Sequence, residues 1–156
     1  MKVQVEKPPI FLYTDGASSG NPGPGGYGVV LICGGYRKEI SGGYARTTNN
    51  RMELLAVIVG LEAIKWENAA VQVWSDSQYV VKAVNEGWLE KWISNDWKKV
   101  KNPDLWQRFV PLFRAHRVTF NWLRGHAGHP ENERCDAMAV AAYSQPDLPE
   151  DSGYKE

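Results

Sequence analysis

The chain has 156 residues with 18 basic and 18 acidic side chains, so its formal net charge is zero. This length predicts one domain over residues 1–156, with loosely packed ends at 1–9 and 144–156, and zero net charge argues against strong nonspecific binding of nucleic acid. The longest apolar run, residues 29–33, is too short to cross a bilayer, and the polar residues 1–9 contain no secretory signal. We therefore expect a cytoplasmic protein without membrane contact.

The first 66 residues predict three antiparallel strands followed by a helix. Residues 10–15 form an apolar, strand-like run, and the segments 27–33 and 36–44 flank a Gly-Gly pair, which is typical of a β-hairpin. Residues 50–66 have helical spacing and are apolar on most sides, which indicates a centrally packed helix.

Helices and strands alternate from residue 71 onward. We expect a strand at 71–75, a helix at 77–86 capped by Ser75 or Asp76, a short helix that ends at 95–96, a helix that starts at 102–103, a strand at 118–123 and a helix at 130–143. Pro111 should kink or break the helix that contains it. This order predicts an α/β fold with a five-stranded mixed sheet, three antiparallel strands and then two parallel ones, flanked by helices on both faces.

Four carboxylates stand where these elements would aim them at one place. Asp15 and Asp76 end strand-like runs, Glu53 lies in the first turn of the central helix, and Asp136 lies in the last helix. Each alone has an ordinary explanation: a turn, an N-cap, a capping box of Asn50 with Glu53, or a solvated helix position. Together they would repel one another unless cations neutralise them, so the cluster predicts bound divalent metal.

The charges are unevenly distributed along the chain. Residues 82–126 carry nine basic and four acidic side chains, whereas residues 127–156 carry two basic and seven acidic ones. The basic stretch is either a contact surface for a polyanion or a solvated helical face.

Two other motifs receive less support. Residues 23–28 match the Gly-x-Gly-x-x-Gly pattern, but they lead into a strand and so lack the helix N-terminus that binds a pyrophosphate. His126, His129 and Cys135 could suggest zinc, but no Cys-x2-Cys pair accompanies them. Cys33 and Cys135 are expected to be free, buried thiols.

Six segments of the chain resemble the motifs of one enzyme family. They are YTDG (13–16), NPGPGG (21–26), TTNNRMEL (47–54), SDSQYV (75–80), DLWQR (104–108) and GHAGHPENERCD (125–136). On these motifs, residues 10–155 resemble type 1 ribonuclease H in its bacterial form, and the resemblance implies a ribonuclease H-like fold.

The resemblance implies endonucleolytic hydrolysis of the RNA strand of an RNA–DNA hybrid, leaving 5′-phosphate and 3′-hydroxyl ends. It implies two Mg²⁺ ions, or Mn²⁺, held by Asp15, Glu53, Asp76 and Asp136, with His126 as a proton-transfer or product-release group. Hard cations prefer such oxygen ligands, and a pair of them can activate water and stabilise the leaving oxygen. A monomer is expected.

Substrate contacts are also carried over from the family. Ser18, where the family often has Cys, together with Asn49 and Gln78, would read the ribose 2′-hydroxyl, which distinguishes RNA from DNA. Asn21 and Thr48 resemble groups that hold a phosphate of the DNA strand. For Thr48 and Asn49, helix capping is the competing explanation, and one residue can do both.

A further contact surface is the family's basic protrusion, here called the handle. Trp88, Trp92 and Trp97 match its spacing, but the cationic run of well-studied bacterial members is replaced by residues 93–96 (ISND), and the loop after Trp97 is shorter, which leaves Lys98, Lys99 and Lys101. A less positive handle predicts weaker hybrid binding at moderate salt. Two alternatives to the nuclease are open: a non-catalytic module that binds hybrids, and another nuclease or recombinase with the same fold.

Overall fold

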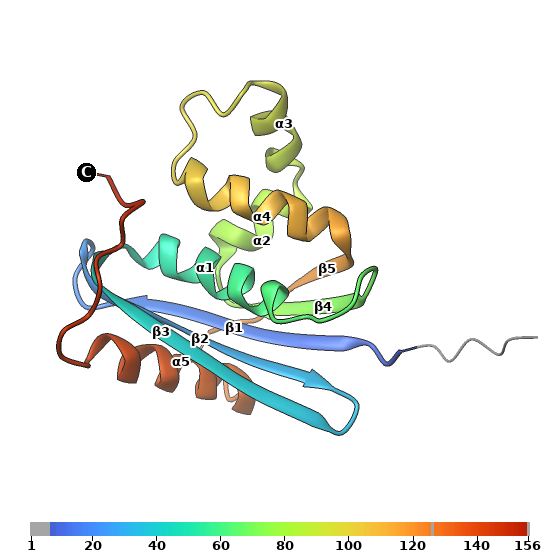
Figure 1. Ribbon diagram of the computed structural model, residues 1–156, viewed down its shortest axis with the longest axis horizontal. Helices are drawn as coiled ribbons and strands as arrows, with labels where there is room; N and C mark the ends of the chain where they lie inside the picture. The colour runs from blue at the N-terminus through green and yellow to red at the C-terminus, as the bar shows by residue number, and fades with distance from the viewer. Residues whose placement is uncertain (1–6, 126, 156) are drawn as a thin grey trace, which may run out of the picture.

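A five-stranded mixed sheet forms the centre of the computed structural model, which describes residues 7–125 and 127–155 (Figure 1). Its order is β3-β2-β1-β4-β5, with antiparallel pairing of β1 with β2 and β2 with β3, and parallel pairing of β1 with β4 and β4 with β5. The strands are β1 (Ile10–Ser18), β2 (Gly23–Cys33), β3 (Tyr36–Thr47), β4 (Ala70–Ser75) and β5 (Arg117–Trp122). The predicted α/β fold class is confirmed.

Helices cover both faces of the sheet, as predicted. They are α1 (Asn49–Glu62), α2 (Gln78–Asn85), α3 (Trp88–Ser94), α4 (Pro103–Ala115) and α5 (Pro130–Tyr143). Figure 1 shows α5 alone on one face, α1, α2 and α4 on the other, and α3 standing away from the sheet beyond α4. Among the described residues, no helix is long and apolar enough to cross a membrane.

The main core lies between the sheet and α1. Leu12 of β1, Val29 of β2 and Val73 of β4 are fully buried, as are Leu54 and Ile58 of α1. The opposite side of α1 packs against α4. A helix enclosed on two sides needs apolar residues around most of its circumference, which explains the composition of α1.

The cap of α1 agrees with one of the predicted alternatives, whereas the cap of α2 differs from the predicted Ser75 or Asp76. Helix α1 is capped by Thr48, whose hydroxyl accepts a hydrogen bond from the N–H of Arg51, and not by a box starting at Asn50. Helix α2 is capped by Ser77, whose hydroxyl accepts from the N–H of Val80, while the hydroxyl of Ser75 accepts from the N–H of Ser77. Each serine hydroxyl satisfies a different N–H group that the start of a helix leaves free.

Helix α4 continues through Pro111, so of the predicted kink or break, the break is wrong. Pro111 lies on the exposed side of the helix, where water can bind the carbonyl that loses its partner. The two cysteines are free, as predicted, but only Cys135 is buried, whereas Cys33 is partly exposed.

The segment after α5 is held more firmly than the loose end predicted for 144–156. The N–H of Ala45 donates to the carbonyl of Pro149 at 2.8 Å. Arg51, whose side chain is 2% exposed, pairs with Asp151 at 2.7 Å and with Asp104 at 2.7 Å. These hydrogen bonds outweigh the effect of burial and raise the pKa of Arg51. The ion pairs attach the chain end to α1 and α4. Most of the other predicted loose end, 1–9, lies outside the described residues.

Candidate active site

Three carboxylates converge at one edge of the sheet. One oxygen each of Asp15, Glu53 and Asp76 lies within 4.8 Å of the others. In the parallel register of β1 and β4, Thr14 pairs with Ser75, so Asp15 and Asp76 follow neighbouring positions where the parallel pairing of the two strands ends, although β1 itself continues to Ser18. This is the edge where open α/β sheets build their sites.

Gly16 brings the third carboxylate to this edge. A Cβ atom on Gly16 would lie 2.3 Å from the main-chain nitrogen of Glu53, so β1 and the first turn of α1 meet without an intervening side chain. The N–H of Gly16 donates to Oδ1 of Asp15 at 2.9 Å and to Oε2 of Glu53 at 3.2 Å. One backbone donor therefore orients two of the acids.

The fourth predicted acid, Asp136, lies on α5 next to this cluster but outside the group of three. A Cβ atom on Gly28 of β2 would lie 2.2 Å from the carbonyl oxygen of Cys135, which lets α5 pack directly on the sheet backbone. The charge of Asp136, which is partly exposed, contributes to the raised pKa of Asp15. The structure thus groups three of the four acids and places Asp136 within electrostatic range.

The acids are costly to ionise together. Burial raises the pKa of Asp15 to about 8, and the charges of Asp76 and Asp136 add to this effect. Burial, followed by the charges of Asp15 and Asp76, raises the pKa of Glu53 well above its ordinary value. A cluster of carboxylate oxygens with such pKa values fits a hard divalent cation, which would replace the protons.

The last residue of β5 and the connection that follows it both contact Asp76, which sequence reasoning missed. The indole N–H of Trp122 donates to the carbonyl oxygen of Asp76 at 3.2 Å. A Cβ atom on Gly125 would lie 2.9 Å from Oδ2 of Asp76. Nothing local in the sequence signals these contacts, because the partners are 46 or more positions apart.

Comparison with known proteins decides the family. The profile of the RNase H family matches residues 7–144. The chain belongs to the ribonuclease H family. It is 60% identical over 147 residues to the ribonuclease H of Desulforamulus reducens, covering 91% of this chain and 92% of that one. It is thus a type 1 ribonuclease H, as predicted.

Solved structures agree with this assignment. LC9-RNase H1, a type 1 RNase H with the type 2 active-site motif, superposes with a TM-score of 0.81 at 33% identity, covering 90% of this chain and 74% of that one. LC11-RNase H1 in complex with an RNA/DNA hybrid superposes with a TM-score of 0.60 at 28% identity, covering 86% and 96%.

The residues that the ribonuclease H resemblance assigns to substrate come from several elements of the fold. Thr48 and Asn21 line a pocket of about 530 Å³, and the side-chain oxygen of Asn21 accepts a hydrogen bond from the N–H of Asn49 at 3.1 Å. Ser18 is the last residue of β1, and Gln78 is the exposed first residue of α2. The capping explanation holds for Thr48, which leaves its phosphate contact a prediction.

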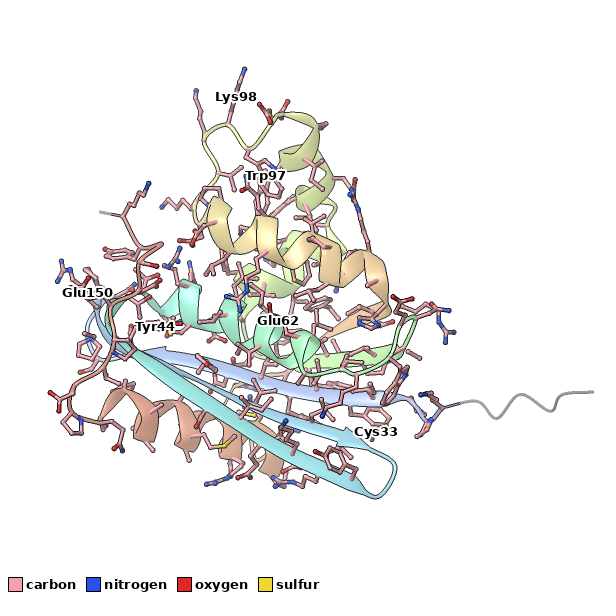
Figure 2. All side chains as sticks on the ribbon, in the orientation of Figure 1. Cys33, Tyr44, Glu62, Trp97, Lys98 and Glu150 are labelled. Atoms are coloured by element: carbon pink, nitrogen blue, oxygen red, sulfur yellow. The ribbon has the colours of Figure 1, made fainter. Side chains whose placement is uncertain are left out.

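The ribonuclease H handle is formed by α3 and the connection to α4. Trp88 is 37% exposed, and its ring centroid lies 6.4 Å from that of Trp92. Figure 2 shows Lys98 at the outer end of this connection, pointing away from the body of the molecule. Lys99 and Lys101 are exposed as well.

His126 lies outside the described residues. His129 is the N-cap of α5 and makes no capping bond with its side chain. Within residues 7–125 and 127–155, the three acids are the one group of potential ligands with metal-like spacing, so nothing there supports the zinc alternative.

Proposed function

We propose that this ribonuclease H hydrolyses the RNA strand of RNA–DNA hybrids with divalent metal ions, leaving 5′-phosphate and 3′-hydroxyl ends. The observation that carries the proposal is the buried group of Asp15, Glu53 and Asp76, whose oxygens lie within 4.8 Å of one another. A module that only binds hybrids has no use for a cluster in which burial, and then the charges of neighbouring acids, raise the pKa of Asp15 to about 8, because such acids weaken the fold unless they bind cations.

Asp15, Glu53 and Asp76 would hold the metal, and Asp136 would complete the ligand set from α5. When bound, two Mg²⁺ or Mn²⁺ ions supply an activated water and stabilise the leaving 3′ oxygen. The N–H of Gly16 fixes the orientation of Asp15 and Glu53. Because this N–H is in place before substrate arrives, the two carboxyl groups need little reorganisation during the reaction.

Hybrid binding is supported by the relative LC11-RNase H1, whose structure contains an RNA/DNA hybrid. In this chain, Asn21 and Thr48 would hold a DNA-strand phosphate in the pocket that they line. Ser18, Asn49 and Gln78 would contact the ribose side of the RNA strand, where the 2′-hydroxyl is available. Trp88, Lys98, Lys99 and Lys101 would extend the contact along the handle.

His126 would transfer a proton or assist product release, since an imidazole titrates near neutral pH. Replacement of His126 by Ala should slow turnover while hybrid affinity stays nearly unchanged. A large loss of affinity would assign His126 to substrate binding instead.

Labelled hybrid, RNA duplex and DNA duplex, each incubated with Mg²⁺, separate the candidate functions. Cleavage of the hybrid alone, lost in Asp15→Asn and retained in the exposed-site control Asp147→Asn, supports the proposal. Binding without cleavage would support a non-catalytic module, and DNA cleavage would support another nuclease of this fold. A cytoplasmic location and a monomeric state stay predictions, for cell fractionation and sedimentation to test.

A further inference from the structure

The C-terminal end of the chain forms one wall of the pocket that Asn21 and Thr48 line. This pocket of about 530 Å³ is also lined by Gly153, Tyr154 and Lys155, the last residues that the structure describes. Figure 1 shows the C-terminal segment, in red, rising past the start of α1. The six motifs that resemble ribonuclease H end at residue 136, so none of them includes this wall.

The acid cluster lies beside this pocket. Asn50 also lines the pocket, and Glu53 follows it by three positions on α1, a rise of about 4.5 Å along a helix. The grooves of a duplex are roughly 6 to 12 Å wide. A hybrid whose RNA strand lies at the acids can therefore place its DNA strand over the pocket.

Hydrogen bonds and ion pairs hold the chain end in this position. Asp151 pairs with Arg51 at 2.7 Å and accepts a hydrogen bond from the hydroxyl of Thr47 at 2.7 Å. The N–H of Tyr154 donates to the carbonyl oxygen of Asp151 at 3.0 Å, which closes a turn. A Cβ atom on Gly153 would lie 2.8 Å from Nη2 of Arg51, so the turn approaches the ion pair closely because it has a glycine there. The wall is thus in place before a ligand binds.

The lining of the pocket carries positive charge that the described residues do not neutralise. Lys101 and Lys155 are both exposed, and within residues 7–125 and 127–155 neither forms an ion pair. Among the described lining residues Asp104 is the one acid, and both of its oxygens accept hydrogen bonds from Arg51. The two lysines therefore favour an anion in this pocket.

We propose that Lys155 binds a phosphate of the DNA strand, so that the chain end, residues 151–155, is part of the hybrid-binding surface. This inference rests on the proposed function, since a duplex bound at the acids is what brings a phosphate to the wall. A lysine ammonium is a mobile point charge, which suits a phosphate. Contacts to phosphate position a duplex without reading its sequence. The contact therefore acts on the affinity for the hybrid, whatever its sequence.

Steady-state cleavage of labelled hybrid separates binding from chemistry. Lys155→Gln should raise KM roughly three- to tenfold at low salt and leave kcat unchanged, whereas Lys155→Arg should keep the wild-type KM. Lys65→Gln is the matched control, because this exposed lysine follows the other end of α1, roughly 20 Å from Thr48. Equal KM values for Lys155→Gln and Lys65→Gln would overturn the proposal.

The salt dependence of binding tests the charge of the contact. Fluorescence anisotropy measures the Kd in the Asp15→Asn background, which should bind hybrid without cutting it. Each phosphate contact adds a slope of about 0.9 to the fall of log affinity with log salt, so one contact weakens about 3.5-fold between 50 and 200 mM salt. With Lys155→Gln added, the loss of affinity over this range should be about 3.5-fold smaller. An unchanged slope would contradict the proposal.

Neutral phosphate analogues identify the strand that Lys155 contacts. A methylphosphonate has no charge, so one placed at the contacted position of the DNA strand removes the contact from the substrate side. In the same background, that hybrid should bind equally well to chains with Lys155 and with Lys155→Gln. Methylphosphonates in the RNA strand should leave the difference between the two chains intact. The reverse pattern would assign Lys155 to the RNA strand and overturn the proposal.

Truncation separates binding from support of the fold. Removal of residues 154–156 keeps the ion pair of Arg51 with Asp151, so Tm should change little while KM rises at least as much as in Lys155→Gln. A lower Tm with an unchanged KM would make the chain end a structural support and overturn the inference. Wild-type protein that neither binds nor cleaves hybrid would overturn the proposed function as well. Wild-type cleavage that Lys155→Gln leaves unaffected would overturn this inference alone.

Discussion

Replacement of Asp15 by Asn should stabilise the metal-free protein while it removes activity. The pKa of Asp15 is about 8 in the fold against an ordinary value of 3.8. The folded chain therefore holds this proton more tightly than the unfolded chain, so the contribution to stability is complete below about pH 4 and is lost as the pH rises through 8.

The size of the effect follows from these values. One pKa unit corresponds to about 1.4 kcal/mol, so ionisation of Asp15 costs the fold up to about 4 kcal/mol by pH 7. An Asn oxygen accepts the hydrogen bond from the N–H of Gly16 less strongly than the carboxylate of Asp15 does, which reduces the expected gain from Asn to roughly 1–3 kcal/mol. This equals a rise in Tm of roughly 3–9 °C for a chain of this size.

Thermal unfolding followed by circular dichroism in EDTA, at pH values from 4 to 9, measures this gain. The difference in Tm between Asp15→Asn and wild type should grow with pH and nearly vanish at pH 4, whereas the exposed control Asp147→Asn should show none. Saturating Mg²⁺ should stabilise the wild type more than the variant and narrow the difference. A variant less stable than the wild type at pH 7 in EDTA, or a difference independent of pH, would refute the reasoning.

Three further measurements test other features of the structure. Gly125→Ala would place a methyl group 2.9 Å from Oδ2 of Asp76. The variant should need roughly tenfold more Mg²⁺ for half-maximal cleavage, with little change in Tm. An unchanged Mg²⁺ requirement would contradict this expectation. Asp151→Ala removes one partner of the buried Arg51. In urea titrations the free energy of unfolding should fall by roughly 1–3 kcal/mol. An unchanged free energy would show that this ion pair does not stabilise the attachment of the chain end. Hybrid affinity should fall less steeply with salt than in relatives with a basic run at 93–96, and equal slopes would count against a weakened handle.

The sequence alone was sufficient to predict the elements that follow from local rules. Asp15 and Asp76 end apolar runs that had to become neighbouring parallel strands, which explains why their clustering could be predicted. Free thiols and the helix start at Pro103 also follow from local chemistry. The helix caps were harder, because Thr48 and Asn50 are both good capping residues and tertiary contacts decide between them.

The features that the sequence alone did not predict depend on contacts between distant parts of the chain. Arg51 and Asp151 are 100 positions apart, and a single acid in a polar segment carries no periodic signal that it will be buried against a helix. The hydrogen bond from Trp122 to the carbonyl of Asp76 also depends on how strand ends meet in space. Pro111 violates a local rule, and the exposure of its helix face makes the violation tolerable.

The closeness of Gly16 to Glu53 and of Gly28 to Cys135 has a consequence for laboratory evolution of this chain. At both places backbone meets backbone, so no rotamer change can absorb an added methyl group. A library selected for folding alone should therefore exclude substitutions at these two glycines while it accepts Asn at Asp15. Positions selected for shape and positions selected for chemistry could then be told apart from sequencing counts before any turnover is measured.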